Sequence, residues 1–146
     1  MAKLKILKSS EVLELRWLVL RKGRDFDSAH MPKDNDSDTI HLGIESNEGA
    51  MLAVASFIAE DTNGEDSKEV YRLRGMAVAE SYQAKGYGTI LFNFAVSMLK
   101  SKGVKTIWCN ARISASEFYL KQGFKVRGDV FEIEHTGPHY QMYLDL

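Results

Sequence analysis

Apolar and polar residues alternate through the first half of the chain in a way that predicts short β-strands. We expect strands at residues 3–7, 41–46, 51–59 and 70–78, with turns at 47–49 and around Asn63 and Gly64. Residues 51–59 are nearly all apolar, which is typical of a strand at the centre of a sheet. Because short turns join the last three strands, these strands should be antiparallel.

The period of the apolar residues changes from 2 to 3.6 in the second half. The apolar residues after Gly88 share one helical face, and this helix should end near Gly103. A buried strand at 105–110 completes a β-α-β unit with parallel strands. Shorter helices are expected from Ser10 and from Ser114, and closing strands at 125–134 and 139–145.

These elements predict an α/β (α+β) fold. Its mixed central sheet should have about six to seven strands, antiparallel at both ends with one parallel pair, and about three to four flanking helices. The chain has 146 residues, of which 45% are hydrophobic, and this length suffices for one buried core. We therefore expect a single domain over residues 1–146.

Charge and cysteine content exclude several classes of protein. Nineteen Lys and Arg against 20 Asp and Glu leave a net charge of −1, without the basic field that nucleic-acid binding needs. The single Cys109 cannot form an internal disulfide, and its apolar strand favours a buried thiol over a nucleophile. No apolar stretch is long enough to span a membrane, so we expect a cytoplasmic protein without membrane partners.

Residues 24–38 are polar and form a long connection, which predicts a mobile or functional loop on the substrate side. Asp34, Asp36 and Asp38 imitate the spacing of a calcium loop, but Thr39 stands where that loop requires glycine. His135 and His139 lack further ligands for zinc. We therefore predict no metal site.

The most informative segment is the turn at residues 83–89, which lies between a strand and an amphipathic helix. Its glycines allow close approach of a ligand to the backbone, and the first N–H groups of the helix can bind a phosphate. The turn lacks the third glycine of the dinucleotide motif and is not a P-loop. By itself, it could also serve only for packing.

A resemblance to a known family favours the binding role. Gln83, Gly86 and Gly88 match the Gln/Arg-x-x-Gly-x-Gly/Ala turn of the GNAT superfamily of N-acetyltransferases. Residues 73–78 look like the fourth strand of that family, and Asn110 with residues 115–124 look like the end of its fifth strand and the helix that follows. The resemblance covers roughly residues 40–146.

The resemblance implies that acetyl-CoA is the co-substrate and binds where the two parallel central strands splay apart, beyond their carboxyl ends. Backbone groups at the end of the fourth strand would contact the pantetheine and the acetyl carbonyl, and those of the turn would bind the pyrophosphate. The cofactor-binding residues would be Met76, Ala77, Val78, Gln83, Ala84, Lys85, Gly86, Tyr87, Gly88, Thr89, Asn110 and Ser116.

Tyr119 matches the family tyrosine that protonates the departing CoA thiolate, and a phenol with a pKa of about 10 suits that role. The alternative is that Tyr119 only packs beside Phe118. The expected reaction is acetyl transfer to a primary amine by direct attack in a ternary complex. The residues leave the base open among His41, Glu45, Glu60, Glu134 and His139.

Arg74 and His139 are weaker candidates for binding the acceptor, which is a small-molecule or peptide amine in the family. A non-catalytic CoA-binding regulatory module is the main alternative to an enzyme. In a third interpretation, the chain is a small nucleic-acid- or protein-binding domain whose glycine turn serves only for packing. A homodimer is possible in the enzyme interpretation, and neither the acceptor nor the oligomeric state follows from the sequence.

Overall fold

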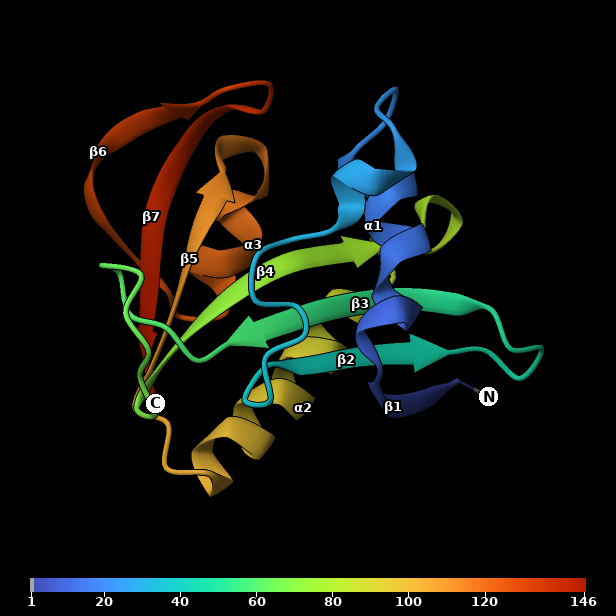
Figure 1. Cartoon of the computed structure of the whole chain (residues 1–146), viewed down its shortest axis with the longest axis horizontal. Helices are drawn as coiled ribbons and strands as arrows, with labels where there is room; N and C mark the ends of the chain where they lie inside the picture. Colours follow the sequence, from blue (N-terminus) through green and yellow to red (C-terminus); the bar gives the residue numbers. More distant parts are fainter. Residues whose placement is uncertain (1) are drawn as a thin grey trace. The chain divides into compact units, whose positions relative to one another are not determined.

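The computed structural model describes residues 2–146, which form seven strands and three α-helices (Figure 1). The strands are β1 (Lys3–Leu7), β2 (Ile40–Glu45), β3 (Met51–Ile58), β4 (Val70–Val78), β5 (Thr106–Arg112), β6 (Lys125–Ile133) and β7 (Gly137–Asp145). The helices are α1 (Leu13–Leu20), α2 (Tyr87–Ser101) and α3 (Ser116–Lys121). Single 3₁₀ turns are η1 (Ser9–Val12), η2 (Phe26–Ala29), η3 (Glu80–Tyr82) and η4 (Ile113–Ala115).

The strands follow the order β1-β2-β3-β4-β5-β7-β6, which confirms the predicted mixed sheet. β1 pairs with β2, β2 with β3, β5 with β7, and β6 with β7, all antiparallel. β4 and β5 form the predicted parallel pair, in which Val70 to Arg72 lie opposite Thr106 to Trp108. Beyond these pairs, β4 continues to Val78 and β5 to Arg112.

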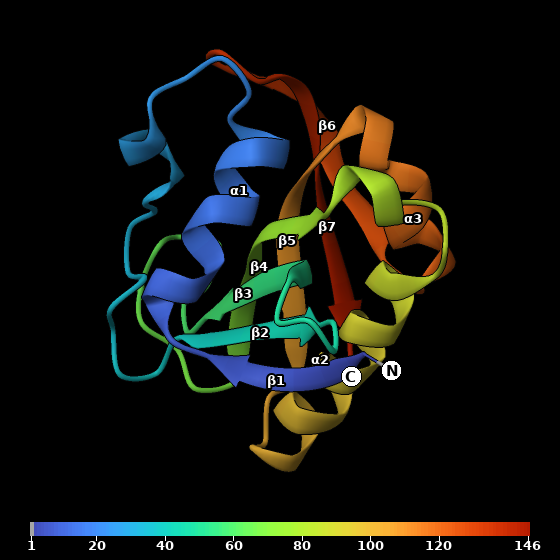
Figure 2. The same ribbon diagram turned by 90° about the vertical axis from the view of Figure 1, so that its right-hand side faces the viewer.

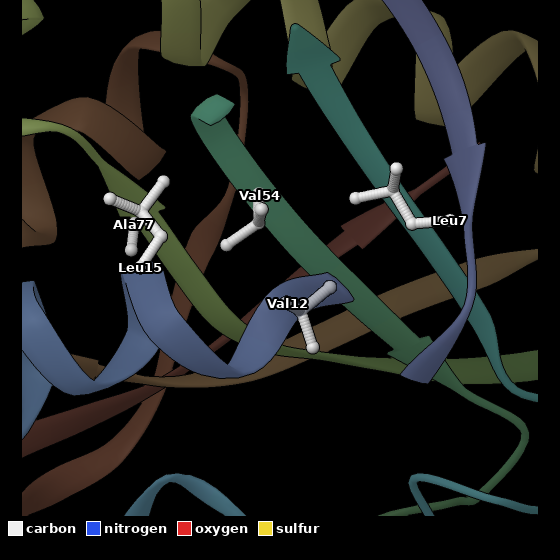
Figure 3. Close-up of a cluster of buried hydrophobic side chains, with 5 residues drawn as sticks. All are labelled: Leu7, Val12, Leu15, Val54 and Ala77. Carbon is white, nitrogen blue, oxygen red and sulfur yellow. The ribbon is translucent and has the colours of Figure 1, made fainter. Parts of the chain in front are cut away.

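The chain divides into two compact units, and the first consists of residues 2–58 and Leu73–Leu99. Within this unit, α1 and α2 cover opposite faces of the strands (Figures 1 and 2). Val12 of η1 and Leu15 of α1 lie on the α1 face and meet Leu7, Val54 and Ala77 (Figure 3). All five side chains are buried. This packing explains why apolar residues alternate along the strands.

The second unit consists of Ala59–Arg72 and Lys100–Leu146. Its first segment turns back on itself through a bridge between Glu60 and Asp66. Trp108 Nε1–H on β5 donates to the carbonyl oxygen of Glu60 at 3.0 Å, and the Arg72 guanidinium lies 4.9 Å from the Trp108 ring centre. These contacts fix the start of the parallel pair.

Two helix starts differ from the sequence prediction. The first helix begins with η1 and not at a Ser10 cap, because the Lys8 N–H donates to Glu11 Oε1 at 2.8 Å and a 3₁₀ turn precedes α1. Ser114 does not cap the later helix either. It lies inside η4, and Ala115 is the residue before α3.

Candidate functional site

The turn after β4 is exposed and its backbone takes unusual conformations. Residues 81–86 are exposed to solvent. Ala84 and Gly86 have φ angles of 60° and 89°, in the left-handed region that favours glycine. The Gly86 carbonyl accepts the Ile90 N–H at 3.0 Å, so α2 begins directly after the turn. A Cβ at Gly86 would meet no atom within 4 Å, which leaves open space above this backbone.

Side chains hold the turn from its flanks. Gln83 Nε2 donates to the carbonyl oxygen of Val78 at 2.9 Å. The rings of Tyr82 and Tyr87 pack edge to face with centroids 5.9 Å apart, and the Lys85 ammonium lies 5.6 Å from the Tyr82 ring centre. The turn is therefore supported by side chains while its backbone faces solvent at the N-terminus of a 15-residue helix. This arrangement suits an anionic ligand such as a pyrophosphate.

The end of β4 leads into this turn. Gly75 has a φ of +64°, a conformation found in strands at bulges, and it directly precedes Met76. Ala77 is buried in the core cluster, whereas Met76 and Val78 are partly exposed, as is Arg74. The N–H of Ala79 donates to the carbonyl of Leu52 at 2.8 Å and fixes the strand end.

Tyr119 lies on α3 in the second unit and is nearly buried. Its ring packs edge to face against Phe118 and Phe124, with centroids 5.2 and 5.3 Å away. Burial, reinforced by the Cys109 thiol, raises the pKa of Tyr119 far above that of a free phenol. The hydroxyl is therefore protonated at physiological pH, and the same burial disfavours the phenolate that proton donation would leave.

Asn110 and Ser116 flank the same part of the second unit. Asn110 Oδ1 is buried and has no hydrogen-bond partner among residues 2–146, so it is a vacant acceptor for a ligand N–H. Ser116 Oγ donates to the carbonyl oxygen of Ile113 at 2.7 Å and so anchors the start of α3. Asn110 thus fits a ligand contact directly, whereas the Ser116 hydroxyl has a local partner.

Three of the candidate bases are engaged in other interactions. Glu45 forms an ion pair with Lys5 at 3.1 Å, and Glu60 forms one with Arg72 at the same distance. His41 is buried and both of its ring nitrogens have partners. These arrangements favour structural roles for all three.

The other two candidates lie at the last hairpin. Glu134 is exposed, and its carboxylate lies 3.5 Å from His135. His139 is buried, and its Nδ1 lies 2.7 Å from the Gly137 carbonyl, which can only accept. The neutral His139 ring therefore carries its lone pair on Nε2.

A buried charged cluster in the first unit was not predicted from the sequence. Arg16 is fully buried and forms a two-pronged ion pair with Asp34, with Nη–Oδ distances of 2.7 and 2.9 Å. Its Nη1 also donates to the Ala29 carbonyl at 2.9 Å, and its Nη2 donates to Ser56 Oγ at 2.8 Å. The Met31 N–H donates to Asp34 Oδ2 at 3.0 Å.

This cluster anchors the polar segment 24–38, which lies on the α1 face of the first unit (Figure 2). Burial alone would raise the pKa of Asp34, but hydrogen bonds from Arg16 and the Met31 N–H, with the charges of Arg16 and His41, lower it below 3.8. Both Asp34 oxygens thus serve the ion pair and not a metal. The sequence held one signal, because Arg16 lies one helical turn after the apolar Val12 in the helix predicted from Ser10.

A mixed sheet with one parallel pair, β4 and β5, and an exposed turn before a helix are typical of CoA-dependent acetyltransferases. The profile of the acetyltransferase (GNAT) family matches residues 10–124, and the chain belongs to this family. This membership supports the predicted co-substrate, acetyl-CoA. No helix within residues 2–146 is both long and apolar enough to cross a bilayer.

Relatives agree with this assignment. The uncharacterized N-acetyltransferase YitI of Bacillus subtilis (strain 168) is 32% identical over 146 residues, which cover 100% of this chain and 97% of that protein. A Lactobacillus plantarum protein, provisionally named an N-acetyltransferase, has a TM-score of 0.83 at 17% identity and covers 99% of this chain and 98% of its own. An aminoglycoside 6'-N-acetyltransferase complexed with coenzyme A has a TM-score of 0.77 at 15% identity, and the match covers 98% of this chain and 96% of that chain.

Proposed function

We propose that the protein transfers the acetyl group of acetyl-CoA to a primary amine by direct attack in a ternary complex. The observation that carries this proposal is the exposed turn after β4, with an open Gly86 backbone at the start of α2. The resemblance of Gln83, Gly86 and Gly88 to the family motif supports the same assignment. When bound, acetyl-CoA supplies an activated thioester.

The turn binds the pyrophosphate through its backbone. The first N–H groups of a helix have no partners within the helix, and the helix dipole places partial positive charge there. The left-handed conformations of Ala84 and Gly86 direct the chain into α2 without side chains covering the backbone at Gly86. Residues 83–89 therefore bind the cofactor mainly by shape and backbone donors.

Met76, Ala77 and Val78 orient the thioester and polarise its carbonyl. Backbone N–H groups aimed at an oxygen that gains negative charge give the largest electrostatic contribution in acyl transfer. The core packing of Ala77 and the hydrogen bond of Ala79 to Leu52 hold this segment rigid. Such donors are effective because they need no rearrangement during the reaction.

Tyr119 donates a proton to the departing thiolate. Its hydroxyl is protonated at neutral pH, and its aromatic neighbours fix the ring. Arg74 and His139 are proposed to bind the acceptor, whose class remains a small-molecule or peptide amine. The Nε2 lone pair of a neutral His139 also makes it the best of the five candidates for receiving the amine proton.

The first experiment measures binding and turnover together. Acetyl-CoA at about a hundred times its dissociation constant should add about 2.7 kcal/mol to the free energy of unfolding and raise the melting temperature by several degrees. Release of CoA thiol across a panel of amines then separates an enzyme from a regulatory module, which would bind without turnover. An unchanged melting temperature at millimolar acetyl-CoA would contradict both.

The second experiment replaces Tyr119 with Phe, which keeps the ring and removes only the hydroxyl. Turnover should fall by about 10²- to 10⁴-fold, because the donor acts as the carbon–sulfur bond breaks, while acetyl-CoA affinity changes little. Tyr143→Phe, on β7 beside Arg127, is the matched control and should retain activity. Normal turnover of Tyr119→Phe would mean that Tyr119 serves only for packing.

A further inference from the structure

The Arg16 side chain joins four segments of the first unit. Arg16 itself belongs to α1, Asp34 and Ala29 to segment 24–38, and Ser56 to β3. The fourth segment is β4, which approaches at Gly75. A Cβ placed on Gly75 would lie 2.6 Å from Arg16 Nε, 3.3 Å from Cζ and 3.4 Å from Cδ. The guanidinium therefore packs directly on the backbone of β4.

With a neutral His41 ring, the hydrogen atoms of the cluster have a consistent arrangement. His41 Nε2 lies 2.9 Å from the Asp34 carbonyl oxygen, which only accepts, so Nε2 carries the hydrogen. In the neutral ring, Nδ1 then accepts from Ser56 Oγ at 2.6 Å, and that oxygen accepts from Arg16 Nη2. Each group thus fixes the orientation of the next.

Stability alone does not explain a charged cluster at this place. Apolar residues of similar volume usually stabilise a core as well as a buried ion pair does, or better. A guanidinium, however, is a rigid planar fork that can fix several segments at once. One of its donors, Nε, is buried and has no hydrogen-bond partner among the described residues. The contact of Arg16 with β4 therefore costs the free energy of one unmade hydrogen bond.

The position of Gly75 gives this arrangement a functional meaning. Its φ of +64° interrupts the regular strand, and the next three residues are Met76, Ala77 and Val78. The direction of their N–H groups depends on the backbone at Gly75, against which Arg16 packs. We propose that Arg16 is a positioning residue that sets the β4 backbone at Gly75 and so orients the segment Met76 to Val78, whose N–H donors on the side away from β3 bind the thioester carbonyl.

This inference rests on the proposed function, which gives those donors their role. The partners of Arg16 have supporting roles. Asp34 and Ser56 hold the guanidinium, and His41 holds the Ser56 hydroxyl and the Asp34 carbonyl. Segment 24–38 is thereby coupled to the catalytic backbone of the same unit. A change in this segment would then alter the chemical step as well as acceptor binding.

The test compares Arg16→Met, which keeps most of the length without the fork, and Arg16→Lys, which keeps the charge. In folded protein, kcat should fall by about 10²-fold in both variants, because small misplacements of catalytic groups are costly, while the KM for acetyl-CoA changes little. Arg21→Met is the control, because Arg21 also binds the segment, through the Ser28 carbonyl at 3.2 Å, whereas the three atoms nearest to a Cβ on Gly75 all belong to Arg16. It should retain wild-type kcat.

The stretching frequency of the carbonyl in ¹³C-labelled acetyl-CoA gives a readout that needs no turnover. Hydrogen bonding lowers this frequency in the wild-type complex, and the shift should disappear in Arg16→Met. A wild-type complex without the shift would overturn the proposed role of Met76 to Val78. If both Arg16 variants keep the wild-type carbonyl frequency shift and the wild-type kcat, the positioning role of Arg16 is wrong, while the proposed role of Met76 to Val78 stands.

Ser56→Ala provides a milder variant should the Arg16 variants fail to fold. It removes one of the groups that hold the guanidinium and leaves the ion pair with Asp34 intact. The proposal predicts a smaller loss of kcat, by about three- to tenfold, with an unchanged KM for acetyl-CoA. Reduced melting temperature with wild-type kcat would show a purely structural cluster and overturn the proposal.

Discussion

Two connecting segments of the first unit, 24–38 and 83–88, are built in opposite ways. The first contains a buried carboxylate, Asp34, and is anchored by the side chains of Arg16 and His41. The second is exposed and is defined by its backbone, with left-handed conformations at Ala84 and Gly86. The polar residues in a sequence therefore do not show whether a connecting segment is anchored by its side chains or exposes its backbone to a ligand.

The difference has a physical origin. A phosphate needs several N–H donors without side chains above them, which an exposed helix start provides. A long connection, in contrast, loses much conformational entropy on ordering, and strong interactions must offset that loss. The two-pronged Arg16–Asp34 pair and the buried Ala29 and Met31 supply them. Substitutions in the two segments should accordingly affect different measured quantities.

The largest expected effect is on stability, in the anchored segment. Asp34→Asn removes the charge that balances a fully buried Arg16, and the free energy of unfolding should fall by about 3–5 kcal/mol. Asp36→Asn, an exposed position in the same segment, should change it by less than about 0.5 kcal/mol. Chemical denaturation of both variants measures this. Equal, small losses would mean that segment 24–38 is not anchored by its carboxylate.

Acid sharpens the same comparison. Because the pKa of Asp34 is lowered in the folded protein, its ionisation stabilises the fold above the ordinary value of 3.8. That contribution is lost as the pH falls through the folded pKa, which lies below 3.8. The stability difference between wild type and Asp34→Asn should therefore be constant near neutrality and shrink below pH 3.8. A difference independent of pH down to full protonation would contradict the assigned charge state.

The strands were largely predictable because their alternation is a local property. β4 has the predicted bounds, β3 ends one residue earlier than predicted, and β2 begins and ends one residue earlier than predicted. The turn after β4 was also found, since glycine spacing is visible in the sequence. The Arg16 cluster was missed because its members lie at positions 16, 34, 41 and 56, which only the fold brings together. The prediction of a mobile or functional segment at 24–38 depended on composition, which carries no information on anchoring.

The next effect should appear in ligand affinity, at the exposed turn. Gly86→Val places a branched side chain over the open backbone, and the dissociation constant of acetyl-CoA should rise at least about tenfold. Gly103→Val is a matched control, because Gly103 has a φ of 87° against 89° at Gly86 and a Cβ at either position meets nothing within 4 Å. Both variants should lose about 1–2 kcal/mol of stability from the left-handed conformation, and only Gly86→Val should lose affinity. If calorimetry gives similar acetyl-CoA affinities for Gly86→Val and Gly103→Val, the pyrophosphate does not bind at this turn.

The smallest expected effect separates backbone from side-chain binding within that turn. Gln83→Met removes the exposed hydrogen bond from Nε2 to the Val78 carbonyl and keeps the length of the side chain. An exposed hydrogen bond contributes at the low end of about 0.5–1.5 kcal/mol, so the dissociation constant of acetyl-CoA should rise only about two- to threefold. A loss as large as that of Gly86→Val would show that a side chain forms the binding surface. The turn would then depend on its side chains, as segment 24–38 does, and the two segments would not differ in this respect.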